Sequence, residues 1–288
     1  MKVGVGLPST IPGVDRDSVL TWARKAEERG FSTLATIDRL VYGNYESLIT
    51  LTAAAAVTER IRLTTDILIS PFRGNGAVLA KQAATIDSLS NGRLTLAVAV
   101  GGREDDYTAT GIPFGERGKL FDAQLAEMKR IWRGEEYGPG GAIGPPSSRP
   151  DGPELVIGGS ISATFRRIAE HGDGWTMGGG TPDQFKETSE KVRAAWSEAG
   201  REGEPRLIAL CYYALGEHAE EAAKEELGDY YAWLGEDIAG MIVSGAAKDE
   251  DTIRGYRDAF AAAGADELIC FPTSTDPAQV DLLADAVL

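Results

Sequence analysis

The stretch from Thr58 to Gly102 constrains the fold more than any other part of the chain. Residues 61–69 and 94–100 are apolar runs of the kind expected for strands buried on both faces. Between them, residues 79–89 carry apolar side chains at helical spacing, and the pair at 91–92, Asn-Gly, suits a helix end. A strand, a helix and a second strand in this order predict a parallel unit. The loops after both strands then lie at the same edge of the sheet.

The same alternation continues along the whole chain. We predict eight strands, each followed by a helix, at residues 2–7, 31–37, 61–69, 94–100, 154–157, 174–177, 207–215 and 267–271. A doubly wound open sheet is compatible with this length. Eight strand–helix units within 288 residues nevertheless favour a closed (β/α)8 TIM barrel. We therefore expect a single barrel domain over residues 1–288.

Two segments do not follow this pattern. Residues 136–153 are rich in Gly and Pro and cannot hold a helix or strand for long. A linker between two domains is one interpretation, but the strand pattern resumes at once, which favours an excursion within one domain. Because the excursion precedes a strand, it should leave from the barrel face opposite the active site. Residues 103–115 are expected to form an acidic loop.

The composition excludes several classes of protein. Acidic residues outnumber basic ones 44 to 29, for a net charge of −15, which disfavours nucleic acid and anionic membranes as partners. Cys211 and Cys270 lie in apolar runs, so two buried reduced thiols are expected rather than a disulfide. No apolar run approaches the roughly 20 residues of a membrane span, and the first residues read as a strand rather than a signal peptide. We expect a cytoplasmic protein.

In a barrel, the residues after the strands carry the chemistry. His171 and His218 are the only histidines, and neither ends a strand, so no metal site is predicted. No lysine lies near a strand end, which argues against Schiff-base chemistry. A nucleophile elbow, a P-loop and a dinucleotide-binding glycine motif are all absent. Paired carboxylates of a glycoside hydrolase stay compatible with the sequence.

Glycines cluster after two late strands. Gly158, Gly159 and Ser160 follow a strand and open a helix, so their N–H groups could bind an anion with the help of the helix dipole. Residues 178–180 are three more glycines, in a second permissive loop. This part of a barrel commonly holds a phosphate. A tight turn with a serine N-cap explains the first motif equally well.

Polar and aromatic side chains mark the expected barrel mouth. Asp38 and Asp66 end neighbouring strands. A single aspartate usually caps a loop, whereas two side by side favour a ligand site. The aromatic residues that could line a pocket there are Tyr42, Tyr45, Phe72, Tyr107 and Trp175.

Several of these blocks resemble the luciferase-like monooxygenase family. The similar segments begin TERIRLTTDILISP at Thr58 and continue to SNGRLTLAVAVGGREDDYTATGIPFGERGKLFDA, with further blocks at 30–40, 154–175 and 257–272. The resemblance implies a (β/α)8 barrel that uses coenzyme F420 or reduced FMN on a small-molecule substrate. It also implies a homodimer and a separate reductase that supplies the diffusible reduced cofactor. F420 is the first choice, because the compact motif is most similar to that branch.

The resemblance also assigns site residues. It places Asp38 beside the ring and the Asp66–Ile67 peptide, often cis in the family, behind it. It places the glycine–serine turn at the phosphate tail. The positions implied for the cofactor are Asp38, Asp66, Ile67, Gly101, Asp105, Gly158, Gly159, Ser160 and Met177. Those expected in the substrate pocket are Arg39, Tyr42, Phe72, Arg73 and Tyr107.

Three departures from the family pattern qualify the assignment. Arg39 stands where many members have a histidine, and Asp66 where a glycine commonly precedes the cis peptide. Gly102 replaces the catalytic acid of the deazaflavin-dependent sugar-phosphate dehydrogenases, which argues against that reaction. Arg39 could balance a negative charge on the reduced ring or on a substrate anion, but a salt bridge with Asp38 or Asp66 is the favoured interpretation. The sequence thus predicts an oxidoreductase that transfers a hydride or activates oxygen. The alternative is a barrel that has lost catalysis and only binds a ligand or partner.

Overall fold

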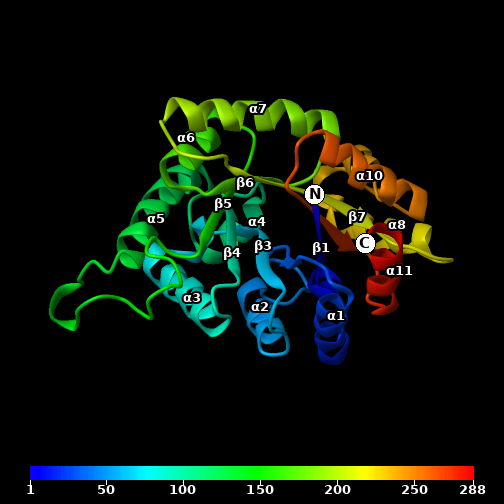
Figure 1. Cartoon of the computed structure of the whole chain (residues 1–288), viewed down its shortest axis with the longest axis horizontal. Coiled ribbons are helices and arrows are strands. Elements are labelled where there is room, and N and C mark those ends of the chain that lie inside the picture. Colours follow the sequence, from blue (N-terminus) through cyan, green and yellow to red (C-terminus); the bar gives the residue numbers. More distant parts are fainter.

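Eight parallel strands close into a barrel in the computed structural model, which describes all residues from 1 to 288 (Figure 1). Each strand pairs with the next, and β8 pairs with β1 to close the ring. The predicted TIM-barrel fold is confirmed. The strands are β1 Lys2–Gly6, β2 Thr33–Thr36, β3 Arg62–Ile69, β4 Leu94–Ala99, β5 Glu154–Gly158, β6 Gly174–Met177, β7 Arg206–Tyr213 and β8 Glu267–Pro272.

Helices surround the barrel, and residues suited to helix ends mark several of their limits, including the predicted pair at 91–92. Gly30 and the pair Asn91–Gly92 adopt the left-handed conformation at helix ends, and Thr181 forms a capping box with Gln184. The helices are α1 Arg16–Arg29, α2 Ser47–Ala55, α3 Gly76–Leu89, α4 Glu104–Thr110, α5 Arg117–Trp132, α6 Ser162–His171, α7 Pro182–Glu198, α8 Ala219–Tyr230, α9 Glu236–Ser244, α10 Glu250–Ala262 and α11 Ala278–Val287.

Helix α4 corrects the prediction that residues 103–115 form a loop. The acidic residues that suggested a solvated loop, Glu104 to Asp106, occupy the first turn of α4, where negative charge favours a helix. Tyr107 anchors the helix, because its side chain is buried and its hydroxyl donates to the Val100 carbonyl. Gly111 then ends the helix in the left-handed conformation.

Side chains fill the barrel interior, so a ligand can bind only beyond the carboxyl ends of the strands. Where the strands begin, Arg206 pairs with Glu154 and Glu267. Above that ionic layer lies an apolar one that includes Val156, Ile208 and Ile269. Between the strands and the helices, a larger apolar core encloses Cys211 and Cys270, which are free, buried thiols as predicted. No helix is long and apolar enough to cross a membrane.

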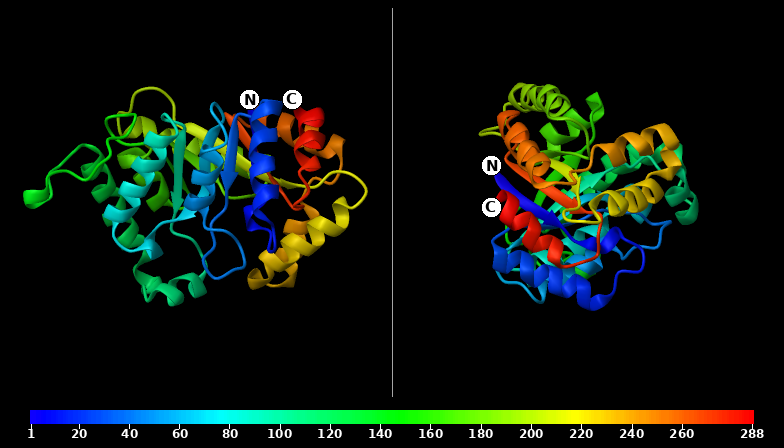
Figure 2. Two further views of the ribbon diagram at one scale, coloured as in Figure 1. Left: turned by 90° about the horizontal axis from the view of Figure 1, so that it is seen from below. Right: turned by 90° about the vertical axis from the view of Figure 1, so that its right-hand side faces the viewer.

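The excursion at residues 136–153 forms an arm that extends from the barrel between α5 and β5 (Figure 1). Its return path is held by Ser148, which donates to Asp87 near the end of α3, and by Arg149, which pairs with Asp173 just before β6. Both contacts lie where strands begin. Figure 2 shows the N-terminus at that end and the yellow and orange helices α8 and α9 at the other. The arm therefore leaves from the face opposite the barrel mouth, as predicted.

Candidate functional site

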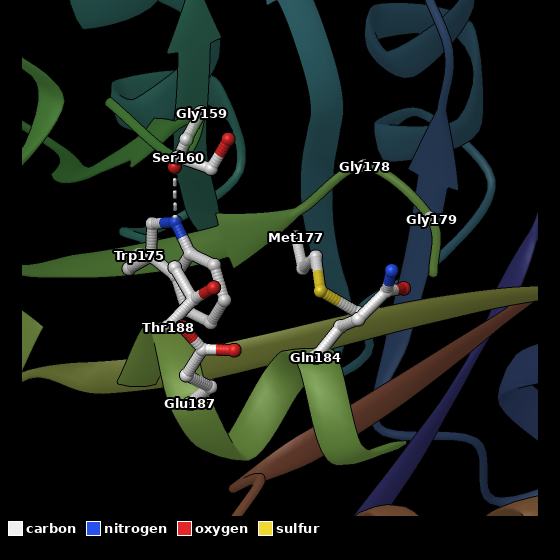
Figure 3. Close-up of a pocket in the computed structure, with 9 residues that line it drawn as sticks. All are labelled: Gly159, Ser160, Trp175, Met177, Gly178, Gly179, Gln184, Glu187 and Thr188. Carbon is white, nitrogen blue, oxygen red and sulfur yellow. Dashed lines mark hydrogen bonds between the residues drawn. The ribbon is translucent and has the colours of Figure 1, made fainter. Parts of the chain in front are cut away.

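A cavity of about 350 Å³ opens beyond the ends of β5 and β6 (Figure 3). Its walls come from the turn after β5, the turn after β6 and the first two turns of α7. We call it the glycine cavity. The residues that line it are Gly159, Ser160, Trp175, Met177, Gly178, Gly179, Gln184, Glu187 and Thr188.

Gly159 shapes the turn after β5. Its φ of +125° is a conformation that side chains rarely allow, and a Cβ there would lie 2.7 Å from Thr164 Oγ1. The turn is fixed from below by Trp175, whose indole Nε1 donates to the Gly159 carbonyl at 2.8 Å (Figure 3). Backbone rather than side chains therefore forms this wall of the cavity.

Helix α6 begins beside this turn without a side-chain cap. Its N-cap residue is Ile161, and no side chain accepts from the N–H groups of the first turn. Ser160 is exposed and is not the cap. The serine-cap interpretation of the motif is therefore wrong. The unpaired N–H groups and the positive end of the helix dipole form the kind of environment that binds anions.

Asp38, in the loop after β2, is held in a buried ion pair. Its side chain is 3% exposed, and its carboxylate accepts from Arg73 at 2.8 Å and from the Ile69 N–H at 3.0 Å. Burial raises the pKa of Asp38 against the pull of the Arg73 guanidinium. Burial also opposes the charge of Arg73, but Asp38 and Glu46 outweigh it and raise the Arg73 pKa. The ion pair therefore holds the loop after β2 against the loop after β3.

Arg39 does not form the expected ion pair with Asp38 or Asp66. Arg73, in the loop after β3, pairs with Asp38 instead. The Arg39 guanidinium stacks on two tyrosine rings, 3.9 Å from the centroid of Tyr42 and 5.0 Å from that of Tyr230. It also donates to the Tyr230 carbonyl at 2.9 Å. Arg39 thus ties the loop after β2 to the end of α8, across the barrel mouth.

Asp66 lies inside the barrel within β3, and its peptide bond to Ile67 is cis, as the resemblance implied. The side chain is 1% exposed and reaches across the barrel, where Oδ1 accepts from Thr176 Oγ1 of β6 at 2.7 Å. Oδ2 has no hydrogen-bond partner. Burial raises the pKa of Asp66 to about 7. Ile67 extends toward β5, where a Cβ on Gly158 would overlap it.

This raised pKa makes stability depend on pH. The folded protein binds the Asp66 proton more tightly than the unfolded chain between the ordinary value of 3.8 and about 7, so stability falls as pH rises through that window. Asp66→Asn keeps the oxygen that accepts from Thr176 and removes the titration. We expect the variant to gain about 2 to 3 kcal/mol relative to wild type between about pH 5 and pH 8. Urea unfolding of both proteins at both pH values measures the free energies of unfolding. A stability difference between variant and wild type that is the same at both pH values contradicts the prediction.

The predicted aromatic residues do not line one common pocket. Phe72, Tyr107 and Phe114 pack edge to face beside α4, with centroids 5.9 and 5.3 Å apart. Trp175 packs on Phe185 in the outer core, and Tyr45 donates to the Val14 carbonyl. Tyr42 alone lines a second cavity, of about 600 Å³, beside α8. The single aromatic pocket is therefore a wrong prediction, because these side chains serve separate packing contacts.

The structure brings the nine residues assigned to the cofactor together in part. Gly159, Ser160 and Met177 share the glycine cavity. Asp38 and Gly101 both contact Ile69, through the hydrogen bond to its N–H and through close packing on its side chain. The remaining residues lie apart from this cavity: Asp66 and Ile67 in the barrel, Gly158 in β5, and Asp105 on the surface of α4, paired with Arg103.

Residues of α7 complete the glycine cavity and were not predicted. Gln184, Glu187 and Thr188 lie three and four positions apart, which places them on one helix face. The pair Thr181–Pro182, a favourable helix start, was the sequence signal that could have identified them. Glu187 is exposed and pairs with Lys191 at the rim.

The chain resembles known proteins along most of its length. The family model described as luciferase-like monooxygenase matches residues 1–269. An uncharacterized protein of Mycobacterium tuberculosis is 34% identical over 173 residues, which cover 56% of this chain and 60% of the relative. The chain thus matches less than two thirds of that relative's length. The pyrimidine monooxygenase RutA of Rhizobium rhizogenes is 26% identical over 272 residues, which cover 83% of this chain and 72% of the relative.

Solved structures share the fold over the full chain. An F420-dependent secondary alcohol dehydrogenase superposes with a TM-score of 0.82 at 18% identity, covering 100% of this chain and 98% of that one. The FMN complex of a type II Baeyer–Villiger monooxygenase of Pseudomonas putida gives 0.73 at 16% identity, covering 99% and 96%. At these identities the likeness concerns the fold. Because the family model matches 269 of the 288 residues, the chain belongs to the luciferase-like monooxygenase family.

Proposed function

We propose that this protein is an oxidoreductase that binds F420, or FMN as the alternative, and acts on a small organic substrate at the barrel mouth. The glycine cavity is the observation that carries the proposal. It combines a backbone wall, which a Cβ at Gly159 would disrupt, with the uncapped start of α6. Both features suit the phosphate group that the two cofactors have in common. Glu187 is the one carboxylate that lines the cavity, and Lys191 pairs with it.

The cofactor, when bound, supplies the hydride or activates oxygen. The chain's own residues bind it, orient it and exclude water. Gly159, Ser160 and Gly178 would hold the phosphate, and Ile67, from the wall of the barrel, would lie behind the ring. Asp66 stands where the family commonly has a glycine, and its charge could repel the cofactor. Burial reduces that charge, because a carboxyl with a pKa of about 7 is partly protonated at neutral pH. A neutral Asp66 adds little repulsion toward an electron-rich reduced ring.

Solved structures with the same fold support both cofactors, and the resemblance of the sequence motif to the F420 branch makes F420 the first choice. The similar structures include an F420-dependent secondary alcohol dehydrogenase and a Baeyer–Villiger monooxygenase in complex with FMN. We propose that a separate reductase supplies the reduced cofactor and that two copies of the chain form a homodimer. The reaction is a hydride transfer if F420 binds, and an oxygenation if FMN does.

A cofactor titration tests the proposal. Trp175 lines the glycine cavity and donates to the turn at Gly159, so its fluorescence should respond when the cavity fills. We expect saturable binding of F420 or FMN with a dissociation constant of about micromolar order. Saturation by one cofactor identifies it. Binding of neither contradicts the redox function and supports the barrel that has lost catalysis.

A charge placed in the cavity should weaken this binding. Gly178 lines the cavity, has no positive φ, and a Cβ there would have no atom within 4 Å, so a side chain fits without strain. We expect Gly178→Asp to weaken cofactor binding about tenfold or more through repulsion of the phosphate. Gly178→Asn has the same shape without charge and should change affinity by less than about threefold. Equal effects of the two variants contradict a phosphate in this cavity.

A further inference from the structure

A second cavity, of about 600 Å³, lies at the barrel mouth between α8 and the loops after β1, β2 and β8. We call it the acidic cavity, because Glu225, Glu226 and Asp229 of α8 line it and no Lys, Arg or His does. Hydroxyl groups of Tyr42 and of residues 273–275 complete its polar wall. Tyr42 donates to Asp229 at 2.5 Å, and none of the three carboxylates forms an ion pair with the protein.

Glu226 is the unusual member of this group. The residue is 8% exposed, yet its carboxylate forms no hydrogen bond and no ion pair with the protein. It also lines a narrow adjoining cavity with Ile37 and Tyr212, which lie near the strand ends. Its carboxylate oxygens are not among the enclosed atoms of the protein, so they face the cavity, where water or a ligand can pair with them. The adjoining cavity has a volume of about 10 Å³, enough for about one water molecule, so the acidic cavity is the space in which a ligand could reach Glu226.

The chemistry of the lining selects an organic cation over a metal ion. No group of three His, Cys, Asp or Glu is placed to hold a metal ion. The space is far larger than a metal ion needs. Tyr42 is the one aromatic residue that lines the cavity, and the guanidinium of Arg39 already stacks on its ring. The carboxylates and hydroxyl groups of the lining are therefore the groups that would bind an ammonium group.

We propose that the acidic cavity binds the ammonium group of an organic cation, with Glu226 as its counter-ion, and that this group belongs to the substrate. The assignment to the substrate rests on the proposed redox function, whereas binding of the cation does not. A substituted amine would place its charged nitrogen at Glu226 and its carbon skeleton in the acidic cavity, which has the volume to hold it. Substrates without a cationic nitrogen leave Glu226 unpaired and should bind more weakly.

A pair of isosteric probes tests the cation site without any cofactor. Choline carries a permanent positive charge, and 3,3-dimethylbutan-1-ol has the same shape with carbon in place of nitrogen. We expect wild-type protein at about pH 9, where Glu226 is ionised, to bind choline at least about tenfold more tightly than the alcohol, measured by calorimetry or ligand-observed NMR. Equal affinity for the two probes overturns the proposal. Because no cofactor is present, this result is independent of the cofactor titration.

Two variants test which carboxylate binds the cation. Glu226→Gln keeps the shape of the buried side chain, and we expect it to reduce the preference for choline to less than about threefold. Glu225→Gln is the matched control, because Glu225 is an exposed neighbour on the same helix and lines the same cavity. It should keep most of the preference. A Glu226→Gln protein that still prefers choline as strongly as wild type overturns the role of Glu226.

The pH dependence of choline binding gives a second test, which needs no variant. Burial, together with Asp229, raises the pKa of Glu226 to about 8. Choline has no titratable group here, so its affinity should rise as Glu226 ionises between about pH 7 and pH 9. The charged and titratable groups that face Glu226 are Glu225, Asp229, Arg39, Tyr42, Tyr212 and Tyr231. Burial raises the pKa of each tyrosine, so these remain neutral. An affinity that is flat with pH contradicts the proposal.

Discussion

Gly159→Asp should abolish cofactor binding, with an affinity loss of at least about a hundredfold, while the barrel stays folded. Two effects act together. The φ of +125° and the 2.7 Å approach of a Cβ to Thr164 Oγ1 force the turn after β5 to move. The new carboxylate also lies where the phosphate is proposed to bind. Gly159 is exposed and outside the apolar core, so the loss of stability should stay small.

A matched glycine separates these effects from general damage. Gly203 also has a positive φ, of +70°, and its carbonyl also accepts from an indole, that of Trp196. It precedes β7, at the opposite end of the barrel from the glycine cavity. A Cβ at Gly203 would have no atom within 4 Å, so Gly203→Asp should cost no more stability than Gly159→Asp and should leave cofactor binding unchanged. Tryptophan fluorescence titration and thermal unfolding of both variants measure this. Similar loss of binding in the two variants contradicts a phosphate site at Gly159.

The fold was predictable because its signals are local. Each strand is a short apolar run followed by a helix with its own start and end residues, and eight such units leave few architectures. The failure at α4 has a local cause as well. Composition between Arg103 and Gly115 suggested solvent exposure, whereas two buried side chains, Asp106 and Tyr107, hold that helix on the barrel.

The site was less predictable, because its contacts join distant residues. Asp38 was found as a strand-end carboxylate, but nothing local indicates that Arg73 would neutralise it. Asp66 meets Thr176 from 110 positions away. Glu226 belongs to an acidic helix and looks like a solvated residue until the barrel places it at the mouth. The turn at residues 158–160 was predicted at the right place in the chain, because its backbone conformation depends on its own glycines.

Arg73→Ala should destabilise the protein by about 3 to 5 kcal/mol, the largest loss of stability expected from a single substitution near the site. Arg73 donates to Asp38 at 2.8 Å and to Glu46 at 2.6 Å, and its side chain is 17% exposed. Its removal leaves Asp38 buried, with only the Ile69 N–H and the Ser47 hydroxyl as partners. Urea unfolding at neutral pH measures the loss.

The cost should also depend on pH, which distinguishes an unpaired charge from lost packing. Without Arg73, the pKa of Asp38 rises further, so the folded state binds its proton more tightly and loses stability as pH increases. The penalty should therefore be smaller at about pH 5 than at about pH 8. Adding Asp38→Asn should recover much of it, because the buried charge is then gone. Arg16→Ala, which breaks an exposed pair with Asp17, should cost less than about 0.5 kcal/mol at either pH. A pH-independent penalty that Asp38→Asn does not relieve would instead assign Arg73 to packing alone.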